Sequence, residues 1–178
     1  VAEAGCEVFI VHARNAWLEG LSPKDNREIP PLRYEVVRQI KHEFPQLTIV
    51  LNGGLVDNPT IAAELQQLDG AMVGRQAYHD PALMAAWDQR FLGTPGEPTE
   101  ADDAWRERIE DGMVAYMARQ HAVPWAHVAR HMLGLWNGQP GARRWRQVWS
   151  DHRLKGATPT EVQRQARQAR LAAAVAAA

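Results

Sequence analysis

In the first half of the chain, short apolar runs alternate with apolar residues spaced as on one face of a helix. Runs typical of β-strands lie at residues 7–12, 47–51 and 71–73. After Pro31, apolar residues recur every four positions until Pro45, which predicts a helix between the first two strands. Further helical patterns follow Asn58 and Asp80, each of which precedes a proline and is expected to cap its helix. This alternation predicts a parallel sheet covered by helices.

The second half of the chain contains no run typical of a strand. A linker rich in glycine and proline over residues 93–99 separates it from the first half. The helical patterns lie at residues 101–121, 124–136, 141–154 and 159–176. The last of them begins with the spacing of a capping box, from Thr158 to Glu161. Four helices joined by short turns predict an up-and-down bundle.

The buried face of the first of these helices follows from its apolar positions. The face is expected to consist of Trp105, Ile109, Met113, Tyr116 and Met117. Five of the seven tryptophans of the chain lie beyond the linker, and most are expected in the core of the bundle. The chain is therefore expected to be α/β followed by all-α, with domains at residues 1–95 and 96–178.

Glycines follow two of the predicted strands, and each glycine signal precedes a helix. Asn52-Gly53-Gly54 comes after the second strand, and Gly74-Arg75 comes after the third. Glycine lets backbone N–H groups approach an anion closely. Arginine adds a positive charge and can donate two parallel hydrogen bonds to the same anion. A (β/α)8 barrel holds phosphate at this place, although three strands are too few for a whole barrel. Either glycine motif alone could serve only to turn the chain sharply at the end of a strand. The occurrence of both, after successive strands, favours an anion-binding site.

His12 lies at the carboxyl end of the first predicted strand, where barrel proteins carry their ligands. Contact with a ligand and a hydrogen bond to a backbone carbonyl are equally good explanations of this histidine. Cys6, at the start of the same strand, is interpreted as a buried structural residue. His127 and His131 have the spacing of two metal ligands on a helix. Without a further ligand cluster, packing is the better interpretation, and no metal is expected.

Charge divides the 178-residue chain unevenly, although its net charge is only −1. Residues 1–99 carry 8 Lys/Arg and 13 Asp/Glu, whereas residues 119–170 carry 10 and 2. The basic segment indicates a polyanionic partner. The alternative is that its arginines simply lie on helix faces exposed to solvent. A helix start with three arginines around one aromatic residue lies at Arg143-Arg144-Trp145-Arg146. This pattern suits contacts with phosphate groups. The alternative is a helix start exposed to solvent, with Trp145 pointing inward. The single cysteine and the lack of a membrane-spanning or signal pattern predict a cytoplasmic protein.

A long loop after the first strand carries the most specific pattern. Residues 11–34, VHARNAWLEGLSPKDNREIPPLRY, closely resemble the signature of the bacterial tRNA-dihydrouridine synthase A family. Gly53-Gly54 and the segments 73–81, 130–135 and 138–143 are also similar to that family, and the resemblance covers nearly all of residues 1–155. It implies an FMN-binding (β/α)8 TIM barrel followed by a helical domain. In that family NADPH reduces the flavin, which then reduces a uridine in the tRNA D-loop.

The resemblance also implies roles for individual residues. FMN, mainly its phosphate, would be held by His12, Asn52, Gly53, Gly54, Gly74 and Arg75. The tRNA would be positioned by Lys24, Arg27, Arg143 and Arg146. The chain matches only the last three barrel strands, and Cys6 does not match the family's catalytic cysteine. We therefore expect a C-terminal portion that is inactive alone. The alternatives are a non-catalytic tRNA-binding module and an unrelated phosphate-binding barrel with a helical tail.

Overall fold

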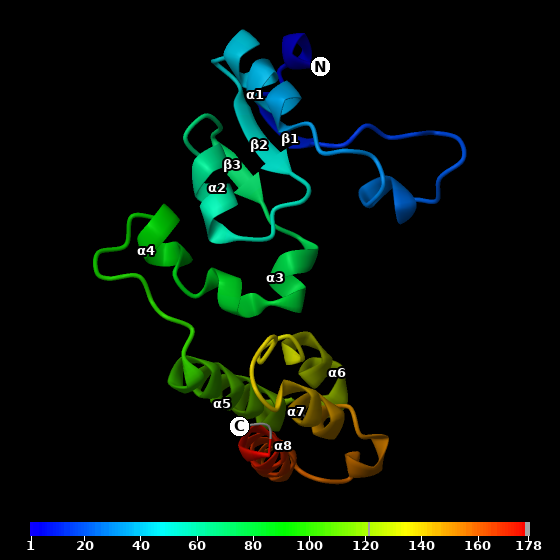
Figure 1. Cartoon of the computed structure of the whole chain (residues 1–178), viewed down its shortest axis with the longest axis vertical. Helices are drawn as coiled ribbons and strands as arrows, with labels where there is room; N and C mark the ends of the chain where they lie inside the picture. The colour runs from blue at the N-terminus through cyan, green and yellow to red at the C-terminus, as the bar shows by residue number, and fades with distance from the viewer. Residues whose placement is uncertain (121, 177–178) are drawn as a thin grey trace. The chain divides into compact units, whose positions relative to one another are not determined.

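The computed structural model describes residues 1–120 and 122–176 and divides the chain into two compact units. The N-terminal unit spans Val1–Gln76, and the second unit, called here the helical unit, spans Ala77–Ala178. The elements are drawn in Figure 1. The domain boundary expected between residues 95 and 96 stays a prediction.

A three-stranded parallel sheet in the order β1-β2-β3 forms the centre of the N-terminal unit. Its strands are β1 (Val8–His12), β2 (Thr48–Asn52) and β3 (Gly70–Met72). The predicted sheet is therefore confirmed. In the register of the sheet, Asn52 pairs with both His12 and Met72, so the carboxyl ends of all three strands lie at one edge.

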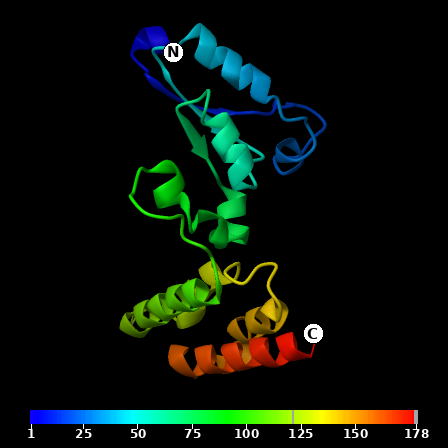
Figure 2. The ribbon, with the colours of Figure 1, turned by 60° about the vertical axis from the view of Figure 1, so that its left-hand side comes forward.

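Within the N-terminal unit, the described helices cover only one face of this sheet, whereas the sequence pattern predicted a covered sheet. Helices α1 (Tyr34–Glu43) and α2 (Asn58–Glu64) connect the strands and lie on the same side of the sheet (Figures 1 and 2). Val37 of α1 is buried together with Ile49 and Leu51 of β2. On the opposite face, Val8 is 57% exposed and Ile10 is 53% exposed.

The cap of α2 differs by one residue from the prediction. Asp57 occupies the N-cap position, and its carboxylate accepts a hydrogen bond from the Thr60 N–H at 2.7 Å. Asn58, the predicted cap, is instead the first helical residue. The other expected cap, Asp80, makes no side-chain capping bond at the start of η3. A carboxylate one position earlier thus outcompetes an asparagine for the same backbone donors.

Helices and turns make up the rest of the described chain, and α5 and α8, with 17 residues each, are the long helices of the second unit. The N-terminal unit also contains η1 (Ala2–Ala4) and η2 (Asp25–Arg27). The further elements are α3 (Arg75–His79), η3 (Pro81–Met84), α4 (Trp87–Phe91), α5 (Asp103–Arg119), α6 (Trp125–Ala129), η4 (Arg130–Met132), α7 (Ala142–Trp149), η5 (His152–Leu154) and α8 (Pro159–Val175). The expected end of a helix at residue 121 lies outside the described residues. In the described part of the chain, no helix is both long and apolar enough to cross a bilayer.

Tryptophans form the core of the helical unit, as the sequence predicted. Trp136 and Trp145 are fully buried, and Trp125 and Trp149 are nearly so. The predicted capping box of α8 is also confirmed, because Glu161 N–H donates to Thr158 Oγ1 and the Thr158 N–H donates to the Glu161 carboxylate. The segments 124–136 and 141–154 are each divided into short helices, and the up-and-down four-helix bundle stays a prediction.

The buried face of α5 agrees only in part with the one that its apolar residues predicted. Met117 is buried in the core, and Trp105 and Met113 pack against it. Ile109 is 40% exposed and Tyr116 is 45% exposed, whereas Arg106 and Glu110 are buried. Arg106 donates from Nε to the Leu135 carbonyl oxygen at 3.1 Å. Charged residues can occupy a core face only where partners satisfy them, and such partners are invisible to hydrophobic periodicity.

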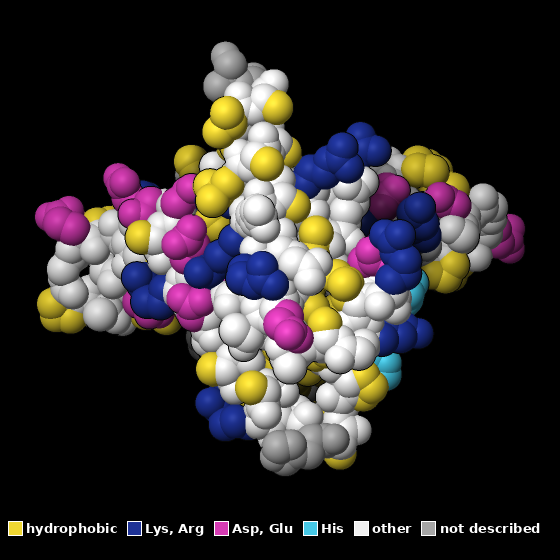
Figure 3. Space-filling model, turned by 90° about the horizontal axis from the view of Figure 1, so that it is seen from below, with side chains coloured by type: hydrophobic (Ala, Val, Ile, Leu, Met, Phe, Trp, Pro, Cys, Tyr) yellow, Lys and Arg dark blue, Asp and Glu magenta, His cyan; other side chains and the backbone are white. Residues whose placement is uncertain are grey.

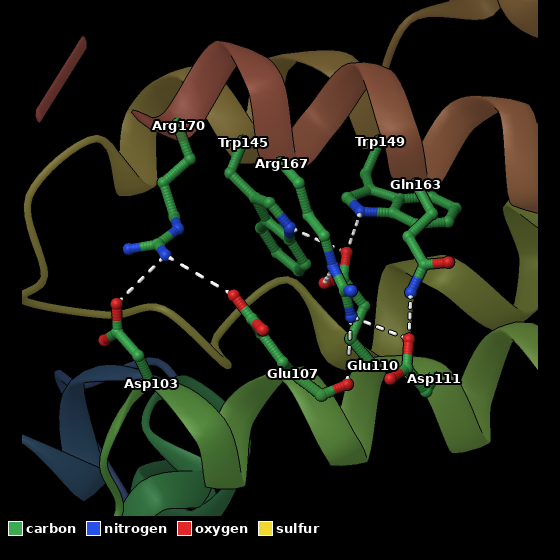
Figure 4. A network of polar contacts seen from close by, with 9 residues as sticks. All are labelled: Asp103, Glu107, Glu110, Asp111, Trp145, Trp149, Gln163, Arg167 and Arg170. Carbon is green, nitrogen blue, oxygen red and sulfur yellow. Dashed lines mark hydrogen bonds and ion pairs between the residues drawn. The ribbon is translucent and has the colours of Figure 1, made fainter. Parts of the chain in front are cut away.

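Glu110 is the centre of a polar network that connects α5, α7 and α8 (Figure 4). One carboxylate oxygen accepts from Trp145 Nε1 at 2.8 Å and from Trp149 Nε1 at 3.1 Å. The other oxygen accepts from Arg167 Nε at 2.8 Å. The side chain of Glu110 is completely buried, so the guanidinium and the two indoles replace its water.

Candidate functional site

The edge of the sheet where the strands end brings together the first group of predicted site residues. His12 and Asn52 are paired neighbours there, and the Asn52 carbonyl oxygen accepts from the backbone N–H of Ala13 at 2.8 Å. Gly53 follows with a φ of 109° and Gly54 with a φ of 70°. Both values lie in the region that glycine tolerates and other residues avoid.

The two glycines also leave room that side chains would fill. A Cβ atom on Gly53 would lie 3.1 Å from Cε1 and 3.3 Å from Nε2 of His12. A Cβ atom on Gly54 would collide with the Leu32 side chain. The Tyr34 hydroxyl donates to the Gly53 carbonyl oxygen at 2.9 Å and so fixes the direction of this loop. Bare backbone is therefore presented beside the imidazole of His12.

The hydrogen bond between His12 and Arg14 determines which nitrogen of the imidazole carries the proton. The Arg14 backbone N–H donates to His12 Nδ1 at 3.3 Å, so in the neutral ring the proton lies on Nε2. Burial lowers the pKa of His12, and the positive charges of Arg14, Arg75 and Arg27 lower it further. At neutral pH the ring is thus an uncharged donor among three cations.

Arg75 contributes to this cationic group and is held by the long loop. Its Nη1 donates to the Glu28 carboxylate at 2.8 Å, and its Nη2 donates to the Arg27 carbonyl oxygen at 3.4 Å. Both side chains of the Arg75–Glu28 pair are about half exposed, so the pair is weak and exchangeable. An anion with more charge than one carboxylate could take its place on Arg75.

The remaining predicted site residues of the N-terminal unit are exposed and have few fixed contacts. Gly74 is exposed, and nothing lies within 4 Å of a Cβ built on it. Lys24 and Arg27 are exposed in and beside η2 of the long loop. Asn26 folds this loop by accepting from the Trp17 N–H at 2.8 Å and donating to the Trp17 carbonyl oxygen at 2.9 Å.

Sequence reasoning missed two residues that shape the site. Arg14 donates from Nη1 to the Pro30 carbonyl oxygen and thereby joins the start of the long loop to its end. Its Nε is buried without a hydrogen-bond partner in the described structure. Tyr34, at the start of α1, fixes Gly53. The only available signal was their position at the two ends of the loop, and neither spacing nor periodicity assigns them a role.

We expect the imidazole of His12 to titrate below its ordinary pKa of 6.5. Between that value and the lower folded pKa, the unfolded chain binds a proton that the folded chain excludes. The free energy of unfolding of the chain therefore decreases, through His12, as the pH falls below 6.5. An NMR titration of the ring measures this, and R75Q should raise the midpoint by removing one nearby cation. A wild-type midpoint at or above 6.5 would contradict the arrangement.

In the helical unit, ion pairs neutralise part of the basic segment. Arg167 pairs with Glu110 and Asp111, and Arg170 pairs with Asp103. Arg153 is likewise paired, with Asp151. Lys and Arg side chains lie in several separate groups on the face shown in Figure 3, with acidic and apolar side chains between them. The excess positive charge is therefore concentrated in the arginines and lysine that lack acidic neighbours.

Arg143 and Arg146 belong to this unneutralised set. Arg143 is exposed and Arg146 half-buried on α7, and neither forms an ion pair within residues 1–120 and 122–176. Trp145 between them is completely buried and points toward Glu110 (Figure 4). The inward orientation considered for Trp145 is thus correct, and this tryptophan leaves the two arginines on the outside of α7.

The other candidate residues do not gather into a site. Cys6 is half-buried rather than buried, and its thiol contacts the Val8 carbonyl oxygen at 3.5 Å. Nδ1 of His131 lies 3.1 Å from the Tyr78 hydroxyl, and the two rings meet edge to face. Among the described residues, no group of three or more His, Cys, Asp or Glu side chains could hold a metal ion.

Comparison of the sequence with known proteins places this chain in a family. A family model described as dihydrouridine synthase (Dus) matches residues 1–173. The tRNA-dihydrouridine(20/20a) synthase of Pseudomonas aeruginosa is 49% identical over 162 residues, which cover 91% of this chain and 48% of that protein. The protein of the same name from Pseudomonas syringae pv. tomato is 51% identical over 150 residues, covering 84% of this chain and 44% of its own.

A third relative, the tRNA-dihydrouridine(20/20a) synthase of Escherichia coli (strain K12), is 45% identical over 159 residues. These residues cover 88% of this chain and 45% of that protein. The chain thus spans slightly less than half the length of the curated relatives that it matches. Since the family model covers nearly the whole chain, the chain belongs to the dihydrouridine synthase (Dus) family.

Proposed function

We propose that this chain is the C-terminal portion of a cytoplasmic tRNA-dihydrouridine synthase, with β1–β3 as the last three strands of a (β/α)8 barrel. The relatives that carry this name share 45–51% of their residues with it. The uncovered apolar face of the sheet supports the barrel, because Val8 and Ile10 lie where a closed barrel buries its interior. Residues 96–178 would form the helical domain that binds tRNA.

The residues at the strand ends fit the phosphate of FMN. Gly53 and Gly54 leave a cradle that a Cβ would fill, and Nε2–H of His12 points to the same place as a donor. Arg75 and Arg27 add positive charge close to that ring. FMN bound there would supply the hydride chemistry, from NADPH to a uridine of the tRNA D-loop. This cationic glycine cradle is the observation that carries the proposal.

In the reaction, these residues would bind the phosphate of FMN and orient the cofactor. Arg75 would exchange Glu28 for the phosphate, and this exchange would release the long loop at residues 27 and 28. Asn52 would hold its side chain at the same strand edge as His12. We assign no catalytic proton donor in this chain, because Cys6 lies at the start of β1 and the site lies at the carboxyl ends of the strands.

Replacement of Arg143 and Arg146 by glutamine tests the tRNA side of the proposal. We expect each substitution to weaken binding of unmodified tRNA and to reduce the slope of log K against log salt by about 0.7–0.9. Filter binding over a range of salt concentrations measures both quantities. R108Q is the matched control, because Arg108 is exposed on α5 and lies outside the basic segment 119–170. If all three variants bind with the wild-type slope, Arg143 and Arg146 do not contact tRNA phosphates.

A further inference from the structure

The helical unit contains a pocket that the proposed function has not used. It lies between α6–η4 and the segment from the end of α7 through η5, and its volume is about 170 Å³. Trp125, Leu133 and Trp149 provide apolar walls. Pockets for drug-sized ligands usually measure ~300–1,000 Å³. This pocket therefore suits one small planar group rather than a complete cofactor.

The aromatic walls of the pocket are held rigidly. Trp149 donates from Nε1 to the buried Glu110, and the ring of Trp125 meets the ring of Trp149 edge to face at 5.7 Å. Both indoles are more than nine-tenths buried, so only the surface lining the pocket remains for a guest. Proteins that bind single-stranded nucleic acid hold unstacked bases against aromatic surfaces of this kind.

The rim of the pocket carries excess positive charge. Arg130 and Lys155 line it, are exposed, and form no ion pair in the described part of the chain. Asp151 is the acidic residue among the lining side chains, and Arg153 binds it through two nitrogens at 2.7 and 3.0 Å. Arg153 lowers the pKa of Asp151 to about 2, so this carboxylate stays ionised and paired. An apolar, aromatic interior below a cationic rim matches a base attached to a phosphate.

We propose that this pocket holds one unstacked nucleotide of the bound tRNA, with its base against Trp125 and its phosphate beside Arg130 and Lys155. This inference rests on the proposed function, since it needs the helical unit to bind tRNA. The chief competitor is an acidic peptide segment of a protein partner, which the same cationic rim would attract. The small, rigid aromatic cavity favours the nucleotide, because burying a carboxylate against an indole surface would cost free energy without a compensating hydrogen bond.

A variant that fills the pocket without changing charge tests this proposal. Ala126 lines the pocket and is half-buried, so A126F would place a ring in the space meant for the base. We expect about 10-fold weaker binding of unmodified tRNA to the full chain, the size of one lost stacking contact. A115F is the matched control, because Ala115 is exposed on α5 and does not line the pocket. It should bind tRNA with the wild-type affinity.

Charge variants provide a readout that does not depend on packing. R130Q and K155Q should each lower the salt slope of tRNA binding by about 0.7–0.9, while R108Q, on α5 outside the basic segment 119–170, should leave it unchanged. These exposed residues keep the proposal testable if A126F fails to fold, as circular dichroism would show.

The results distinguish failure of the pocket proposal from failure of the proposed function. If wild-type chain binds tRNA but A126F binds as tightly as A115F, or the two charge variants keep the wild-type slope, the pocket proposal is wrong and the proposed function stands. If A126F weakens binding of polyglutamate but not of tRNA, the pocket is a protein-binding site and the proposal is also wrong. If wild-type chain binds no tRNA, both fail together.

Discussion

Replacing Glu110 with alanine will lower the free energy of unfolding of the helical unit by about 3–5 kcal/mol. The substitution removes the acceptor of three hydrogen bonds at a side chain that is completely buried. Arg167 would lose its buried partner, and the indole N–H groups of Trp145 and Trp149 would remain unsatisfied. Arg167 would keep Asp111 as a partner, so most of the cost comes from the two orphaned indole donors, at about 1–3 kcal/mol each. The cost therefore exceeds that of an ordinary surface ion pair.

Chemical denaturation followed by tryptophan fluorescence measures this effect, because four of the core residues are tryptophans. E107A is the matched control, since it lies one turn earlier on α5 and approaches Arg170 only at 3.9 Å across a partly exposed pair. We expect it to cost less than about 1 kcal/mol. Equal losses in E110A and E107A would show that the buried network does not stabilise the unit.

The Glu110 network also shows where sequence reasoning about this fold stops. The apolar residues of α5 correctly predicted Met117 on the buried side, but they also predicted Ile109 and Tyr116, which are exposed. The helix buries Glu110 and Arg106 as well. A charged residue can be buried only because partners from α7 and α8 reach it, and these partners lie 35 to 57 residues away. Such pairing depends on tertiary packing, which a local pattern does not contain.

At the strand ends the sequence was more informative, because backbone geometry there is local. A strand followed by glycine predicts where the chain turns, and parallel pairing then places His12 beside Asn52. Arg75 illustrates the limit, since its partner Glu28 lies 47 residues earlier in the long loop. The loop contributed a family signature, whereas its contacts through Arg14 and Tyr34 required the folded structure.

Gly53 is the position at which a single side chain should do most damage to the proposed phosphate site. We expect G53V to weaken binding of the FMN phosphate at least about 10-fold, the equivalent of ~1.4 kcal/mol. Valine at a φ of 109° is strained, and its Cβ would lie 3.1 Å from the imidazole of His12. The ring must move or the loop must shift, and either change separates Nε2–H from the backbone donors.

Phosphorus NMR of FMN titrated with the chain measures this effect, because the phosphate signal does not depend on contacts made by the flavin ring. G112V is the matched control, since Gly112 is exposed on α5 and nothing lies within 4 Å of a Cβ built there. It should leave the phosphate titration unchanged. Circular dichroism separates loss of the site from loss of the fold. If folded G53V shifts the phosphate signal as wild-type chain does, the glycine cradle is not the phosphate site, and His12 and Arg75 must serve another ligand.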